Sequence, residues 1–83
     1  MIRVLFFGSL RDAAGHSELR LSPPAEINTV GALAAWIARD NPELLLATKK
    51  PGMRVARDQD FCSLETPLAG AAEIAFMSPL SGG

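Results

Sequence analysis

The fold of this 83-residue chain is decided by six residues near its N-terminus, Ile2-Arg3-Val4-Leu5-Phe6-Phe7. Ile2, Val4 and Phe6 alternate with the other three, which is the two-residue period of a β-strand. Both alternating sets are largely apolar, so we expect a central strand that is covered on much of both faces. The aromatic residues Phe6, Phe7 and Phe76 are accordingly expected in the core.

The segment that follows this strand should turn the chain back beside it. Gly8-Ser9 ends the apolar run, and residues 10–15 are expected to form one short turn that Gly15 closes. Residues 18–21 then alternate again and predict a second strand, antiparallel to the first. Pro23-Pro24 stops that strand, because neither proline can donate a hydrogen bond to a sheet.

The clearest element is a helix for which Thr29 is a good N-cap. Pro42 lies just beyond its expected end, and residues 43–48 could form one further helical turn. The apolar residues of the helix recur at the i, i+3, i+4, i+7 spacing of one face: Val30, Leu33, Ala34 and Ile37. A helix with one apolar face needs a sheet to cover that face.

The C-terminal half predicts short strands at residues 54–57, 60–62 and 73–77, with Leu64 and Leu68 as core residues between them. The helix supplies a crossover, and the last strand should pair beside the first. The predicted fold class is α+β, a ubiquitin-like β-grasp in which one main helix packs across a small mixed sheet. We expect residues 1–77 to form this domain and residues 78–83 to form a flexible tail.

Composition excludes several classes of function. The net charge is −1 without a run of like charges, which is atypical of a nucleic-acid binder, and no apolar run reaches the ~20 residues of a membrane span. The apolar start is too short for a signal peptide, so we expect a cytoplasmic protein. The chain has one cysteine, Cys62, and one histidine, His16, whereas a structural zinc site needs four ligands, so we expect no metal site. Cys62 is expected to be a small buried residue, and His16 a solvated turn residue.

The last six residues, Ser78-Pro79-Leu80-Ser81-Gly82-Gly83, have no periodicity. Because glycine has no Cβ, the Gly82-Gly83 end can thread a channel too narrow for other residues and place its carboxylate deep inside a partner. That carboxylate is ionised at neutral pH. It can attack an activated phosphate to give an acyl-adenylate, which a sulfur nucleophile converts to a thiocarboxylate. The chain has no phosphate-binding glycine loop, so the ATP chemistry must belong to a partner.

Several stretches together resemble the family of molybdopterin synthase small subunits. The resemblance covers nearly the whole chain and is most specific at its ends, in residues 1–15 and in Pro79-Leu80-Ser81-Gly82-Gly83. Thr29-Val30, residues 66–68 and residues 73–76 match it as well. The chain departs from the family pattern at Ala71-Ala72, where Gly-Asp is frequent, at Met77-Ser78, where an aromatic residue and proline are common, and at Arg57-Asp58, where Val-Asn is frequent.

The resemblance implies a sulfur carrier that is not catalytic alone. In such carriers the Gly83 carboxylate is adenylated by a ubiquitin-activating-enzyme-like adenylyltransferase that uses ATP, and is then converted to a thiocarboxylate. The tail enters the large subunit of molybdopterin synthase, usually in a heterotetramer, and donates sulfur to cyclic pyranopterin monophosphate for molybdenum cofactor biosynthesis. The chain itself would bind no cofactor. Gly82 and Ser81 would thread the channel, and four residues would contact partners: Met77, Pro79, Leu80 and Arg11.

Two other functions fit the same pattern. A carrier of this fold could serve thiazole synthesis or tRNA thiolation instead, although the length and the Phe6-Phe7 pair favour the molybdopterin synthase subunit. A ubiquitin-like interaction domain with no chemistry at its terminus is the alternative from another class, because a fold does not fix a function. An autonomous enzyme is disfavoured, since the sequence shows no nucleophile–base pair.

Overall fold

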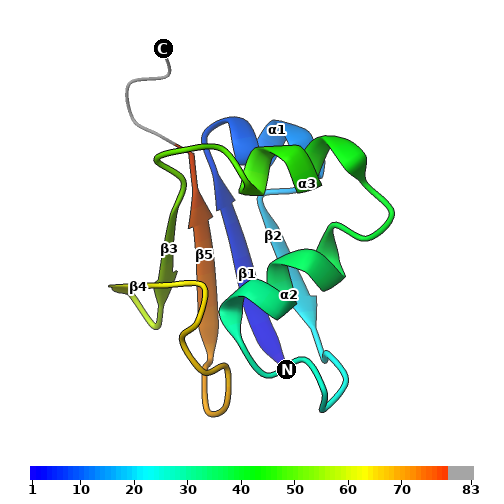
Figure 1. The fold of residues 1–83 in the computed structure, drawn as a ribbon. Helices are drawn as coiled ribbons and strands as arrows, with labels where there is room; N and C mark the ends of the chain where they lie inside the picture. The colour runs from blue at the N-terminus through cyan, green and yellow to red at the C-terminus, as the bar shows by residue number, and fades with distance from the viewer. Residues whose placement is uncertain (79–83) are drawn as a thin grey trace.

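Residues 1–78, the part of the chain that the computed structural model describes, form a mixed five-stranded sheet with helices on one face (Figure 1). The strands are β1 Ile2–Phe7, β2 Glu18–Leu21, β3 Arg54–Arg57, β4 Asp60–Cys62 and β5 Glu73–Met77, and the helices are α1 Ser9–Ala14, α2 Val30–Ile37 and α3 Pro42–Thr48. The strand order is β2-β1-β5-β3-β4, with β1 and β5 parallel and the other pairs antiparallel. The predicted strands and the main helix are confirmed, and the last strand does lie beside the first.

Strand β1 is central, as predicted, but only one of its faces is covered. Ile2, Val4 and Phe6 point toward the helices and are at most 9% exposed, whereas Phe7 is 49% exposed. The expectation that both faces are covered, and that Phe7 belongs to the core, is therefore wrong. The physical reason is that all three helices pack on the same face, so no part of residues 1–78 forms a layer over the opposite face, which we call the open face.

Helices α2 and α3 each begin after a residue whose side chain accepts a hydrogen bond from a backbone amide of the first turn. The hydroxyl of Thr29 accepts a hydrogen bond from the Ala32 amide at 3.0 Å, which confirms it as the N-cap of α2. Asn41 does the same for α3, accepting from the Leu44 amide at 3.1 Å. Its side-chain amide also donates to the Ala13 carbonyl at 3.0 Å and thereby ties α3 to α1.

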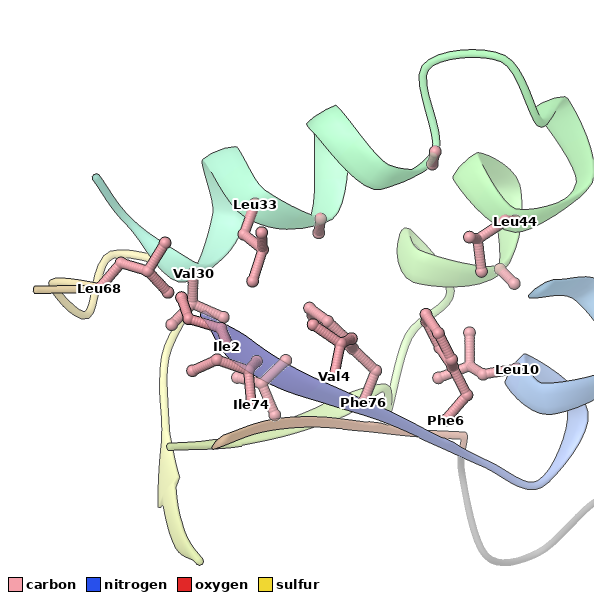
Figure 2. Close-up of a cluster of buried hydrophobic side chains, with 14 residues drawn as sticks. Ile2, Val4, Phe6, Leu10, Val30, Leu33, Leu44, Leu68, Ile74 and Phe76 are labelled. Atoms are coloured by element: carbon pink, nitrogen blue, oxygen red, sulfur yellow. The ribbon is translucent and has the colours of Figure 1, made fainter. Parts of the chain in front are cut away.

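The core lies between the sheet and the helices (Figure 2). Phe6 and Phe76 come from adjacent parallel strands and stack with ring centroids 6.0 Å apart. Burying each large side chain contributes roughly 1.5–3 kcal/mol relative to leaving it exposed. The largest fully buried side chains are Phe76, Leu10, Leu33, Ile74, Val4 and Val30.

Of the two leucines predicted for the core after β4, only Leu68 belongs there. Leu68 is 4% exposed, but Leu64 is 43% exposed, so that expectation was wrong. The Leu64 carbonyl accepts a hydrogen bond from the Gly31 amide at 2.8 Å, so the backbone at this position, rather than its side chain, is what attaches the segment to α2. Among the described helices, none has the length and apolarity needed to cross a membrane.

Candidate functional site

The predicted reaction centre continues from the end of a central strand. Strand β5 lies between β1 and β3 and ends at Met77, at the end of the sheet where α1 begins (Figure 1). This end of β5 coincides with the predicted domain boundary. The predicted site residues Gly83, Gly82, Ser81, Leu80 and Pro79 lie outside the described residues. The structure therefore describes Met77 and Ser78, which precede the predicted reaction centre, but not the centre itself.

Ser78, the first residue of the predicted tail, is attached to the turn between β1 and α1. Its hydroxyl accepts a hydrogen bond from the Ser9 amide at 3.1 Å and lies 3.5 Å from the Phe7 carbonyl, to which it can donate. The tail therefore leaves the domain from a defined point beside Gly8, in contact with the backbone of both flanking residues.

The two predicted partner-contact residues that are described lie on either side of this point. Met77 is half-buried at the end of β5, and its neighbours in register are Phe7 on β1 and Arg54 on β3. Arg11 is exposed on α1, the helix whose first residue is bonded to Ser78. Both residues therefore belong to the end of the domain from which the tail leaves.

Sequence reasoning missed an apolar surface on the open face. Strand register places six residues together there, which we call the open-face cluster: Leu5, Phe7, Ala56, Phe61, Ala75 and Met77. Phe7 is 49% exposed and Phe61 is 65% exposed, while the two alanines between them are buried. Exposed aromatic side chains on an apolar face are typical of a protein-binding surface.

A signal for this cluster was present in the sequence. Phe7 shares the alternating set of Arg3 on β1, and a charged residue on that set indicates a solvent-facing surface. A single main helix can cover only one face of a sheet, so the Phe7 set had to be the uncovered one. Phe61 could not be assigned to a face of the sheet in this way, because β4 has only three residues and is too short to show a clear alternation.

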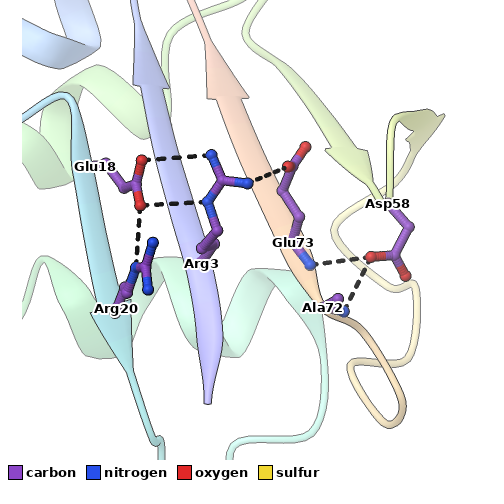
Figure 3. A network of polar contacts seen from close by, with 6 residues as sticks. All are labelled: Arg3, Glu18, Arg20, Asp58, Ala72 and Glu73. Atoms are coloured by element: carbon purple, nitrogen blue, oxygen red, sulfur yellow. Dashed lines mark hydrogen bonds and ion pairs between the residues drawn. The ribbon is translucent and has the colours of Figure 1, made fainter.

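The same face has a polar end, formed around Arg3 (Figure 3). The carboxylate of Glu18 accepts hydrogen bonds from Arg3 and Arg20, each at 3.2 Å, and these bonds, that from Arg3 first, lower the pKa of Glu18 below its ordinary value. Arg3 also lies 3.5 Å from the Glu73 carboxylate on β5. Ion pairs thus connect β1, β2 and β5 at the end of the open face opposite to the tail.

Asp58 connects two of the positions at which the chain departs from the family pattern. Its side-chain oxygen accepts hydrogen bonds from the amides of Ala72 and Glu73, both at 2.9 Å (Figure 3). The backbone at Asp58 and Gln59 has positive φ, as the tight turn between β3 and β4 requires. The turn into β5 is therefore fixed by a side chain from the β3–β4 turn.

One hollow of the domain has no nucleophile–base pair in it. It measures about 370 Å³ and lies between α3, β3 and β4. Its lining combines apolar, hydroxyl and cationic side chains with the half-buried Cys62, and contains no carboxylate or imidazole to act as a base: Thr48, Lys49, Lys50, Met53, Arg54, Val55, Cys62, Ser63 and Leu64. The lone His16 is exposed on a different segment, as predicted. Within residues 1–78, no three potential metal ligands of the His, Cys, Asp and Glu types come together.

Comparison with known proteins gives consistent matches over the whole chain. Residues 4–83 match the model of the ThiS family. Two proteins called molybdopterin synthase sulfur carrier subunit, from Escherichia coli and Haemophilus influenzae, are 32% and 31% identical over 83 residues, which is 100% of this chain and of each relative. Among solved structures, SAMP1 from Haloferax volcanii superposes with a TM-score of 0.76 at 22% identity, covering 99% of this chain and 98% of that one, which confirms the predicted fold.

Proposed function

The chain belongs to the ThiS family, and from this membership we propose that it is the sulfur-carrier subunit of a molybdopterin synthase. The observation that carries the proposal is its full-length identity of 32% and 31% to two relatives of that name. The family match extends to residue 83, so it includes the Gly82-Gly83 end on which the chemistry depends.

The proposed chemistry takes place at the Gly83 carboxylate. A carboxylate oxygen attacks the α-phosphate of ATP, which forms an acyl-adenylate and releases pyrophosphate. A sulfur nucleophile then attacks the acyl carbon, and AMP leaves with the electrons of the broken C–O bond, so that a thiocarboxylate remains. Both steps use groups from a ubiquitin-activating-enzyme-like adenylyltransferase, and this chain needs no cofactor of its own.

The large subunit is the proposed site of sulfur delivery. Gly82 and Ser81 would pass through a narrow channel. The thiocarboxylate sulfur would bond to cyclic pyranopterin monophosphate, and water would then cleave the bond between this sulfur and the acyl carbon of Gly83, which leaves the sulfur on the pterin and restores the carboxylate. Glycine suits this passage because it adds no side chain to the width of the tail. A complex of two small and two large chains, in the cytoplasm, is the arrangement that we propose.

The open-face cluster is the surface that we propose for contact with the large subunit. It includes the end of the strand that leads into the tail, so a partner that takes up the tail would also cover it. Its exposed rings, Phe7 and Phe61, are of the aromatic type that is enriched at the cores of protein–protein interfaces. Pro79 and Leu80 would extend this apolar contact, and Arg11 would pair with an acidic group at its edge.

Removal of Gly83 tests the proposal directly. The truncated chain should transfer no sulfur when supplied with activating enzyme, ATP, a sulfur donor and the large subunit, and its melting temperature should match that of the full chain. A chain extended by one alanine beyond Gly83 is the matched control for tail length. A truncated chain with full activity would refute the carrier mechanism.

Intact-mass spectrometry separates the alternatives. After incubation with the activating enzyme, ATP and a sulfur donor, the full chain should exchange one oxygen for sulfur at its terminus. An unchanged mass would favour an interaction domain without terminal chemistry. A chain that gains sulfur but does not sulfurate pyranopterin with the large subunit would be a carrier for another pathway, such as thiazole synthesis or tRNA thiolation.

A further inference from the structure

Gly8 has a backbone conformation and a neighbour that both exclude a side chain. Its φ is 66° and its ψ is −140°, a region that residues with a Cβ rarely adopt. A Cβ placed on Gly8 would overlap the hydroxyl oxygen of Ser78. The space left by the missing side chain of residue 8 is therefore filled by the side chain of a residue that lies 70 positions later in the sequence.

The Ser78 hydroxyl is bonded to the backbone on both sides of Gly8. It accepts from the Ser9 amide at 3.1 Å and can donate to the Phe7 carbonyl at 3.5 Å. Gly8 is the N-cap of α1 but has no side chain to accept an amide of the first turn. Ser78 takes over that task, so the start of α1 and the base of the tail are held by the same hydroxyl group.

We propose that Gly8 and Ser78 form a latch that sets the direction in which the C-terminal residues leave the domain, and that Ser78 is thereby a positioning residue for sulfur delivery. The second part rests on the proposed carrier function. Residues 79–83 can extend about 17 Å beyond this point. A change of direction at the base moves the tip by several ångströms, and sulfur transfer requires the reacting atoms to be placed much more closely than that.

Strand pairing already attaches the end of β5 to the sheet, so the latch affects only the direction of the chain after β5. Met77, one residue before the latch, is already fixed between β1 and β3 by its register with Phe7 and Arg54. Residue 78 is the first position at which the chain could turn freely. A single hydrogen-bonded side chain at that position therefore decides where the tail points, although it adds little to the stability of the sheet.

Amide hydrogen exchange of Ser9 in the full chain tests the latch without any partner. Ser78→Ala should speed exchange at Ser9 by roughly three- to tenfold, the factor that one hydrogen bond is worth, and Ser78→Thr, which keeps the hydroxyl, should leave it near wild type. Ser22→Ala, at an exposed position after β2, is the matched control. Unchanged exchange in Ser78→Ala would overturn the latch.

Sulfur transfer from the thiocarboxylated chain tests the positioning role. Ser78→Ala should slow single-turnover transfer by roughly three- to tenfold while its affinity for the large subunit stays unchanged, and Ser78→Thr should restore the rate. Faster Ser9 exchange together with a wild-type transfer rate would reduce the latch to a structural feature and overturn the positioning role. A wild-type chain that transfers no sulfur would instead refute the proposed function, while the exchange measurement would still decide whether the latch exists.

Discussion

The two ends of the open face are built from the same strands but use their side chains in opposite ways. At the polar end, the charged groups of Arg3, Glu18 and Glu73 are directed at one another. The apolar end is the open-face cluster, where Phe7 and Phe61 remain 49% and 65% exposed. Both ends are exposed to water in the isolated chain, so solvent exposure alone does not distinguish a surface that binds a partner from one that does not.

The difference lies in whether the exposed groups already have partners. Each charge at the polar end has a neighbour of opposite sign within 3.5 Å, so covering this end would add desolvation cost without a new interaction. The rings at the apolar end would lose water on contact and gain packing. Arg54 is the one cation that the described part of the chain places against these rings, with its guanidinium 4.2 Å from the centroid of the Phe61 ring. Binding is therefore expected at the apolar end alone.

Phe7→Asp should break this comparison most strongly. A charge placed in the open-face cluster would have to be buried without a partner, and we expect association with the large subunit to weaken by about 2–4 kcal/mol. Isothermal titration calorimetry measures this change. The free energy of unfolding should fall by only about 1 kcal/mol, because Phe7 is half-exposed in the isolated chain.

Leu46→Asp is the matched control for that change. Leu46 is a large apolar residue that is 68% exposed on α3, in the helix layer and thus away from the open face. Its replacement should leave the affinity for the large subunit unchanged. An equal loss of affinity in both variants would show that the open-face cluster is not the contact surface.

Met77→Asp should give a smaller loss of affinity, about 2 kcal/mol, because Met77 is half-buried and offers less surface than Phe7. It also tests whether the strand leading into the tail is part of the contact. The measurement is calorimetric affinity alongside the melting temperature. Unchanged affinity would remove Met77 from the interface and restrict the contact to Phe7 and Phe61.

Gly8→Ala tests the junction beside the apolar end. Gly15 lies in the left-handed helical region, and a Cβ on it would meet no atom within 4 Å, whereas Gly8 has a ψ of −140° that residues with a Cβ rarely adopt, and a Cβ on it would overlap Ser78. Gly8→Ala should therefore destabilise the fold by about 1–2 kcal/mol more than Gly15→Ala, in the lower part of the usual range for overpacking because the Ser78 side chain can turn away. Chemical denaturation measures both. Equal losses would mean that neither the ψ of Gly8 nor contact with Ser78 adds to the strain of positive φ at residue 8.

The sequence was sufficient to predict the strands and the main helix, because the local signals of these elements agree with their tertiary packing. The apolar stripe from Val30 to Ile37 and the N-cap Thr29 predict α2 without knowledge of any neighbour. Alternation predicts β1 and β5, and a single crossover helix leaves few ways to arrange them. The site predicted at Gly82-Gly83 stays a prediction, because these residues lie outside residues 1–78.

The features that sequence reasoning missed are contacts between distant segments. Alternation separates the two faces of β1, but Leu5 and Phe7 make the set that contains Arg3 nearly as apolar as the other set, so Phe7 was placed in the core. The bond between Ser78 and Ser9 joins residues at opposite ends of the chain, and no periodic pattern marks it. The support of the turn before β5 by Asp58 is of the same kind.

Glu18→Gln, at the polar end of the open face, should have the smallest effect of these substitutions. It tests whether the polar end takes part in binding. Arg3 and Arg20 lower the pKa of Glu18 in the folded state, so its ionised form stabilises the fold above the ordinary glutamate pKa, and this contribution disappears as the pH falls through the lowered value. The variant should melt slightly lower than wild type at neutral pH, and the two curves should converge in acid. Salt should reduce the difference, because the groups are exposed. Its affinity for the large subunit should equal that of wild type, whereas a loss comparable to that of Met77→Asp would place the polar end inside the interface and remove the distinction between the two ends.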